Sequence, residues 1–186
     1  YPKHFDLVAI SVNPGFDFFD ADFLSKICAE IGVPFIEAKS DIKEIVFDIR
    51  KEKNPCSLCA NLRRGILNTT AIEHNCNKIA LGHNEDDVLE TFLMNVLYTG
   101  NISTFAPVSY MDRSKMTLIR PLIYVSEKQT NSFIKRKEIT IMPKACPMDG
   151  FSKREEIKQL LYNLSKQIPQ SRIVAMSFCE PRSCVM

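Results

Sequence analysis

The chain has 186 residues, of which 45% are apolar, and its 24 basic residues nearly balance its 22 acidic residues. This length suits one domain with a sizeable core. A formal charge of +2 gives no reason to expect a nucleic-acid partner unless the basic residues gather on one surface. Because the chain contains no apolar run as long as a membrane span and no signal-peptide pattern, we expect a cytoplasmic protein without a membrane partner.

Short apolar runs alternate with segments of helical spacing along the chain. They predict strands at 5–13, 33–38 and 78–82, helices at 20–32, 41–51, 59–75 and 85–97, then a hairpin at 108–122 and helices at 127–137 and 153–167. Alternation of this kind indicates an α/β fold, a Rossmann-like parallel sheet with helices on both faces. No linker divides the chain, so we expect a single domain over residues 1–186 that ends in a helical tail at 151–186.

The segment LGHNEDD (residues 81–87) follows a predicted strand and opens a predicted helix. Ligands of parallel sheets bind at the carboxyl ends of the strands, which makes this segment a candidate site. Gly82 allows a close backbone approach, His83 and Asn84 offer hydrogen bonds, and Asp86 and Asp87 are suited to hold Mg²⁺ or a reacting group. Helix capping by Asn84, with the two aspartates interacting with the helix dipole, explains the same residues equally well.

The cysteines form a second candidate site. Cys56 and Cys59 have the Cys-x-x-Cys spacing of metal ligands, and Cys146, between two prolines, is a candidate third ligand. Three thiolates suit an iron-sulfur cluster with one open iron, or zinc with a fourth ligand of another kind. Arg63 and Arg64 follow the cysteine pair, and on a helix at least one of them would face back toward the thiols and attract an anion.

At this point the sequence resembles a known family. The segments CSLCANLRRGIL, KIALGHNEDDVLETFLMN and IRPLIYVSEK, together with Cys146, occur in an order similar to that of the tRNA 2-thiocytidine biosynthesis enzymes of the PP-loop ATPase superfamily. The resemblance covers residues 5–168 and implies the adenine nucleotide alpha hydrolase-like PP-loop fold. Such enzymes use ATP and Mg²⁺ to adenylate the C2 oxygen of an anticodon-loop cytosine, then replace that oxygen with sulfur.

The resemblance also implies cofactors, partners and roles for individual residues. Three cysteines, here Cys56, Cys59 and Cys146, would hold a 4Fe-4S cluster, with zinc as the alternative occupant. Gly82, His83, Asn84 and Arg64 would bind ATP, and Asp86, Asp87 and Arg63 would act in catalysis. The partners would be tRNA and a sulfur donor such as a cysteine desulfurase. The sequence leaves open whether two chains form a homodimer.

Three departures from the family pattern keep alternatives open. The phosphate-binding loop Ser-Gly-Gly-x-Asp-Ser is absent, so we expect an N-terminal strand and loop to be missing and ATP binding to be poor. Asp149 stands where relatives carry the second cysteine of another Cys-x-x-Cys, and the C-terminal tail is short. The alternatives are a divergent PP-loop ATPase with another substrate, and a zinc-stabilised nucleotide- or RNA-binding module; a lysidine-type ligase would leave the cysteines without a purpose.

Basic residues gather in the C-terminal third of the chain. They offer either a tRNA-binding surface or an ordinary solvated face. The residues concerned are Lys135, Arg136, Lys137, Lys144, Lys153 and Arg154.

Overall fold

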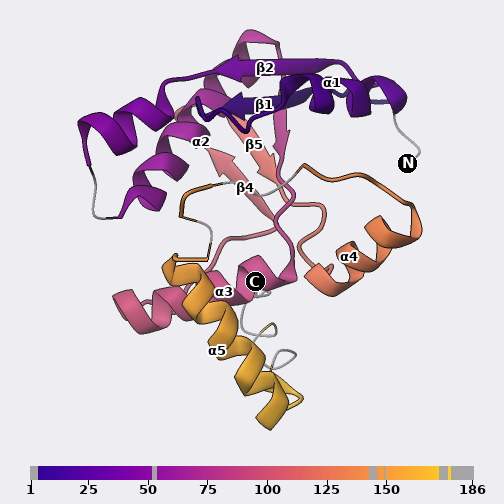
Figure 1. The fold of residues 1–186 in the computed structure, drawn as a ribbon. Helices are drawn as coiled ribbons and strands as arrows, with labels where there is room; N and C mark the ends of the chain where they lie inside the picture. Colours follow the sequence, from indigo (N-terminus) through magenta and orange to yellow (C-terminus); the bar gives the residue numbers. More distant parts are fainter. Residues whose placement is uncertain (1–3, 52–53, 143–145, 149, 172–175, 177–186) are drawn as a thin grey trace. The chain divides into compact units, whose positions relative to one another are not determined.

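The computed structural model describes residues 4–51, 54–142, 146–148, 150–171 and 176. The chain divides into two compact units, which we treat separately (Figure 1). The first comprises Tyr1–Asn77 and Met142–Ala145, and the second comprises Lys78–Ile141 and Cys146–Met186. The single domain with a helical tail at 151–186 stays a prediction.

The first unit contains a strand-helix-strand element, as predicted. Strands β1 (Ala9–Asn13) and β2 (Phe35–Lys39) pair in parallel, with Ala9 opposite Phe35. Helix α1 (Ala21–Glu30) connects them, and it begins where the Asp20 carboxylate accepts a hydrogen bond from the Phe23 N–H at 2.8 Å. This cap satisfies one of the free backbone donors of the first helical turn, which explains why the helix begins here.

Two further helices complete the core of the first unit. The π-helix η1 (Glu44–Ile49) stands where an ordinary helix was predicted at 41–51, and α2 (Pro55–Glu73) begins with a proline, which has no backbone N–H to leave unpaired. Apolar residues of α2 pack against a buried cluster formed by the two strands and the segment that contains η1. The cluster consists of Val12, Ala38, Ile42 and Val46, and the α2 residues against it are Leu58, Cys59, Leu62, Ile66 and Leu67.

The second unit is built on a three-stranded sheet in the order β3-β5-β4. Strand β3 (Lys78–Ala80) runs parallel to β5 (Met116–Ile119), and β4 (Val108–Met111) is antiparallel to β5, which confirms the predicted hairpin. Because β3 and β5 are parallel neighbours, the segments that follow them leave the same edge of the sheet.

Helices with clear sequence caps accompany this sheet. Helix α3 (Glu85–Met94) continues directly into the π-helix η2 (Asn95–Thr99), which ends at Gly100 with φ of +69°. Helices α4 (Glu127–Arg136) and α5 (Lys153–Gln167) begin at Ser126 and Ser152, whose hydroxyls accept backbone N–H groups three residues later. These starts agree with the prediction because serine three residues before glutamine or glutamate is a sequence-level cap.

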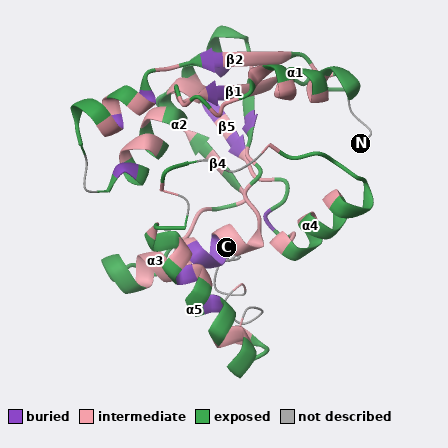
Figure 2. Cartoon of the chain, viewed as in Figure 1, coloured by how far each residue is buried: buried purple, intermediate pink, exposed green. Residues whose placement is uncertain are grey.

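A buried cluster of this unit lies where α3 meets α5 (Figure 2). Leu89 of α3 is fully buried and packs with Ile157 and Leu161 of α5, with Leu93 and Met94 at the margin. This contact fixes α5 against the helix that carries the acidic motif. Among the described residues, no helix is long and apolar enough to cross a membrane.

We expect Leu89→Ala to lower the free energy of unfolding by about 2–5 kcal/mol, because truncation leaves a cavity between α3 and α5. Urea denaturation of the second unit's helices would measure it. The matched control is Leu97→Ala, whose side chain is 56% exposed and leaves no buried cavity. Equal losses in the two variants would contradict the packing described here.

Candidate active site

The carboxyl ends of β3 and β5 bring three polar side chains to one edge of the sheet. β3 leads into Gly82, His83 and Asn84, and β5 leads directly into Arg120. The pairing extends past the strands, since the Leu81 N–H donates to the Ile119 carbonyl at 2.9 Å. This is the position at which open parallel sheets bind ligands, so the predicted location of the site agrees with the topology.

Gly82 is exposed in this segment, and its φ is not positive. A methyl group added at its Cα would meet no heavy atom of the described residues within 4 Å. Neither backbone conformation nor packing within the described residues therefore requires glycine here. The close approach of a ligand to the Gly82 backbone stays a prediction.

The acidic residues after Gly82 each make a structural contact. Asn84 and Asp87 form a reciprocal capping box, with N–H to side-chain oxygen distances of 2.9 and 3.1 Å. Asp86 accepts the backbone N–H of Glu127, the first residue of α4, at 2.6 Å. The capping alternative is thus present in the structure, and the catalytic roles of Asp86 and Asp87 stay predictions.

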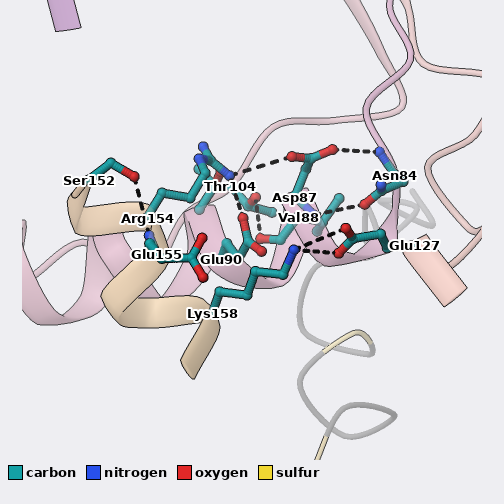
Figure 3. A network of polar contacts seen from close by, with 11 residues as sticks. Asn84, Asp87, Val88, Glu90, Thr104, Glu127, Ser152, Arg154, Glu155 and Lys158 are labelled. Carbon is teal, nitrogen blue, oxygen red and sulfur yellow. Dashed lines mark hydrogen bonds and ion pairs between the residues drawn. The ribbon is translucent and has the colours of Figure 1, made fainter. Parts of the chain in front are cut away.

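A polar network surrounds these carboxylates (Figure 3). Arg154 of α5 places Nη1 2.9 Å from the Glu90 carboxylate and 3.6 Å from Asp87 Oδ1, while Nη2 donates to Thr91 Oγ1 at 3.3 Å. Lys158, one turn further along α5, lies 2.7 Å from Glu127 Oε2. Two cations of one helix therefore hold α3 and the start of α4 together.

Glu90 is the buried member of this network, with 5% of its surface exposed. Burial raises the pKa of its carboxyl, and the hydrogen bond and charge of Arg154 partly oppose that shift. The Arg154 side chain is 43% exposed, so the pair stands at the boundary between core and solvent.

His83 contacts an aromatic ring that also contacts a cation. Its ring centroid is 4.9 Å from that of Phe105, and the Arg120 guanidinium lies 4.6 Å from the same Phe105 centroid. Burial lowers the pKa of His83; Asp87 opposes the shift, whereas Arg120 and Arg154 add to it. A neutral imidazole results, and its buried Nδ1 has no partner among the described residues.

Arg120 is anchored to the loop before β4. It donates to the Ala106 carbonyl and, at 3.3 Å, to Ser109 Oγ. Its buried Nε has no partner within the described part of the chain. No role was predicted for Arg120 or Phe105; for Arg120 the available signal was its place in the segment IRPLIYVSEK, which carries the family resemblance.

The predicted cysteine site is divided between the two units. Cys56 is exposed at the start of α2, Cys59 is half-buried one turn later, and Cys146 is exposed in the second unit. None of the three forms a disulfide with another described cysteine. Across the described ranges, no three His, Cys, Asp or Glu side chains form a group that could hold a metal ion. The metal site therefore stays a prediction, and Asp149, Cys179 and Cys184 lie outside the described residues.

Arg63 and Arg64 are both exposed on α2. Each helical residue turns the side-chain direction by about 100°, so Arg63 stands about 40° from Cys59 and Arg64 about 140° from it. Arg64 donates to Asn61 Oδ1 at 3.0 Å. Arg63 is thus the arginine that shares the cysteine face, and the predicted roles of both stay predictions.

Comparison with protein-family models matches residues 5–164 to the PP-loop domain. This match covers both units and includes the glycine-histidine-acid segment and the cysteine pair. The chain therefore belongs to the PP-loop family. The predicted α/β fold class is confirmed by this match and by the solved structure described next.

Proteins similar to this chain are named as tRNA thiolation enzymes. The tRNA-cytidine(32) 2-sulfurtransferase of Citrifermentans bemidjiense is 35% identical, with 97% of this chain and 73% of the relative aligned. The protein of the same name from Aeromonas salmonicida is 38% identical over 90% of this chain and 56% of its own length. These matches confirm the resemblance to the tRNA thiolation enzymes stated above.

A solved structure supports the same relationship. The U34-tRNA thiolase NcsA from Methanococcus maripaludis, with its [4Fe-4S] cluster, gives a TM-score of 0.75 at 29% identity. The aligned region covers 93% of this chain and 60% of that one. The chain thus spans less than two thirds of the thiolase. The relatives named above are sulfurtransferases, which confirms the prediction of an enzyme.

We expect His83 to titrate below its ordinary pKa, and Arg120→Gln to move that pKa upward because the substitution removes a nearby cation. Asp87→Asn should move it further down by removing the opposing carboxylate. The chain has only three histidines, so NMR titration can resolve each ring. Arg113→Gln on the exposed β4–β5 turn is the control. A His83 pKa that is unchanged in both variants would contradict the placement of Arg120 and Asp87 near the His83 ring.

Glu90→Gln tests the buried carboxyl. Because burial raises the folded-state pKa of Glu90, folding takes up a proton between the unfolded and folded pKa values. As the pH rises through that window, the wild type should lose unfolding free energy relative to the Gln variant. In an Arg154→Gln background the window should extend to higher pH. Urea unfolding at a series of pH values measures the change and its shift in the Arg154→Gln background. If the wild type instead gains unfolding free energy relative to Glu90→Gln as the pH rises, the ion pair outweighs the effect of burial.

Proposed function

We propose that this protein is an ATP-dependent tRNA sulfurtransferase that replaces the C2 oxygen of an anticodon-loop cytosine with sulfur. The observation that carries the proposal is the 35% identity, over 97% of the chain, to a tRNA-cytidine(32) 2-sulfurtransferase. The edge of β3 and β5, with an open glycine, a neutral histidine and an arginine, supports it as a nucleotide-binding position.

The chemistry needs an activated carbonyl, because the C2 oxygen of cytosine is a poor leaving group. In the proposed reaction that oxygen attacks the α-phosphorus of ATP and pyrophosphate leaves. Sulfur at the oxidation level of sulfide then attacks C2, and AMP departs with the original oxygen, so no net oxidation occurs. Positive charge near the phosphates stabilises both departing groups.

Side chains of the second unit supply the binding functions. Exposed Gly82 lets the nucleotide approach the backbone, and Arg120 places a permanent cation at the same edge. His83, neutral and with an unsatisfied Nδ1, would serve as a hydrogen-bonding group rather than as a second cation. Asp86 and Asp87 are held in fixed orientations by Glu127 and Asn84, and one of them would bind the Mg²⁺ that accompanies ATP.

The thiols fit an iron-sulfur cluster by their chemistry. Cys56 and Cys146 are exposed, Cys59 is half-buried, and within the described part of the chain none of the three is used in a disulfide. These three residues would hold the [4Fe-4S] cluster, and Arg63 would place its charge on the same face of α2. When bound, such a cluster would supply an open iron position for the incoming sulfur. We further propose tRNA as the substrate and a cysteine desulfurase as the sulfur donor.

Anaerobic purification followed by iron, sulfide and zinc analysis tests the metal assignment. We expect brown protein with iron and acid-labile sulfide, both lost in Cys56→Ala and Cys146→Ala, because each substitution removes a ligand. Cys28→Ala is the matched control, since Cys28 lies on α1 outside the predicted site. The same protein, expressed at full length in cells lacking their own thiolation enzyme, should restore 2-thiocytidine in tRNA hydrolysates. Colourless protein with stoichiometric zinc, or absent thionucleoside, would contradict the proposal.

A further inference from the structure

A hollow runs along helix α4 within the second unit. It consists of two adjoining cavities of about 760 and 730 Å³, and both are lined by Ser126, Lys128 and Ser132 of α4 and its cap. Cavities of this size accommodate a ligand as large as a nucleotide. We call the two cavities together the α4 groove.

The α4 groove begins at the acidic motif and extends along α5. Asp86 and Glu90 line the second cavity at one end, and Tyr162 and Ser165 of α5 line it at the other. Lys158 and Ser165 are seven residues apart on α5, which corresponds to about 10 Å of groove. A strand lying in it would therefore pass beside Asp86, one of the predicted catalytic residues.

One face of α4 supplies the positive charge of the groove. Lys128, Ser132 and Lys135 are spaced by four and three residues, so their side chains leave the helix on the same side. Both lysines line the groove and are exposed. Within the described residues, no carboxylate lies within salt-bridge distance of Lys128, Lys135 or Arg136.

Two of the four acidic residues that line the groove are paired with cations of α5. Glu127 pairs with Lys158 at 2.7 Å, and Glu90 pairs with Arg154 at 2.9 Å. Asp86 accepts the backbone N–H at the start of α4, and Glu85 lines only the first cavity. The cations of α4 therefore remain available to an anionic partner.

Exposed aromatic rings accompany these cations. Tyr162 of α5 is 55% exposed and Phe133 of α4 is 47% exposed. Lys166 lies 4.2 Å from the centroid of the Tyr162 ring, and Arg136 lies 5.9 Å from that of Phe133. Alternating cations and exposed aromatic rings are what single-stranded RNA requires, since phosphates contact the cations and unpaired bases stack on the rings.

We propose that the α4 groove binds the single-stranded loop of an RNA substrate, with Lys128 and Lys135 on backbone phosphates and Tyr162 stacked on an unpaired base. This inference rests on the proposed function and specifies where the substrate would lie. It also separates the basic residues into two groups: Lys135 and Arg136 face RNA, whereas Arg154 is engaged with Glu90 and Asp87 inside the protein. Lys144 lies outside the described residues.

The test compares two double variants of equal charge change. Lys128→Gln/Lys135→Gln removes the groove cations, and Arg113→Gln/Lys115→Gln removes two exposed cations of the β4–β5 turn in the same unit. The probe is a fluorescein-labelled RNA stem-loop with cytidine in its loop, titrated by fluorescence anisotropy at several salt concentrations. We expect the groove variant to bind about tenfold more weakly than the wild type. The salt slope, which is the slope of the logarithm of the binding constant against the logarithm of the salt concentration, should fall in magnitude by about 1.4, as for two phosphate contacts to single-stranded RNA. The turn variant should change binding by about twofold or less.

A second pair of variants tests stacking. Tyr162→Leu should weaken binding of the stem-loop about tenfold with the salt slope unchanged, because it removes an aromatic face and no charge. Tyr110→Leu is the control, since Tyr110 is similarly exposed, at 57%, on β4. Binding of a fully paired duplex should not respond to Tyr162→Leu.

Each remaining result has a distinct meaning. If the wild type binds the stem-loop but the groove and turn variants weaken it equally, the groove assignment is overturned and the proposed function stands. The same holds if Tyr162→Leu and Tyr110→Leu are indistinguishable from wild type. If the wild type fails to bind the stem-loop even at low salt, both the groove and the tRNA substrate are overturned.

Discussion

The charged side chains at the junction of α3 and α5 are organised around one ion pair, between Arg154 on α5 and Glu90 on α3, beside the apolar contact of the same two helices. Glu90 belongs to the helix that begins with the acidic motif, and Arg154 reaches it from 64 residues later in the chain. Removing one partner of a buried pair leaves a charge without compensation, which costs about 3–5 kcal/mol, and the partial exposure of Arg154 reduces that cost. Because Arg154 also faces Asp87, the same cation keeps α5 in place and orients a carboxylate of the candidate site.

The candidate site combines one permanent charge with one group held neutral. Arg120 cannot lose its proton under ordinary conditions, whereas His83 is kept uncharged by burial and by its cationic neighbours. Phe105 separates the two and contacts both. In the proposed function, Arg120 would attract the phosphates of the nucleotide, and the neutral ring of His83 would offer it a hydrogen bond.

Local features of the structure followed from the sequence, while long-range features did not. Ser126 with Gln129 and Asn84 with Asp87 form helix caps whose two members lie three residues apart in the sequence. The starts of α4 and α3 were therefore predictable. The contact between Arg154 and Glu90 has no local signal, because charged residues of helices usually face solvent. Neither π-helix was predicted, since η1 and η2 have the apolar spacing of ordinary helices. Cys56 and Cys59 were placed together by spacing, whereas the partnership with Cys146 rests on family resemblance.

The π-helix η2 has a consequence for how this family can vary in length. A π turn accommodates about one more residue than an α turn, so the chain after it is rotated by about 100° relative to a continued α-helix. Tyr98 lies within η2 and faces α5. Its hydroxyl donates to the Glu156 carboxylate at 3.2 Å, and its ring centroid lies 5.6 Å from Lys153 Nζ. Deleting one residue between 95 and 99 would restore regular helix and turn Tyr98 away from α5. Relatives that align with a single gap here should therefore lack the contact between this tyrosine and the start of the last helix.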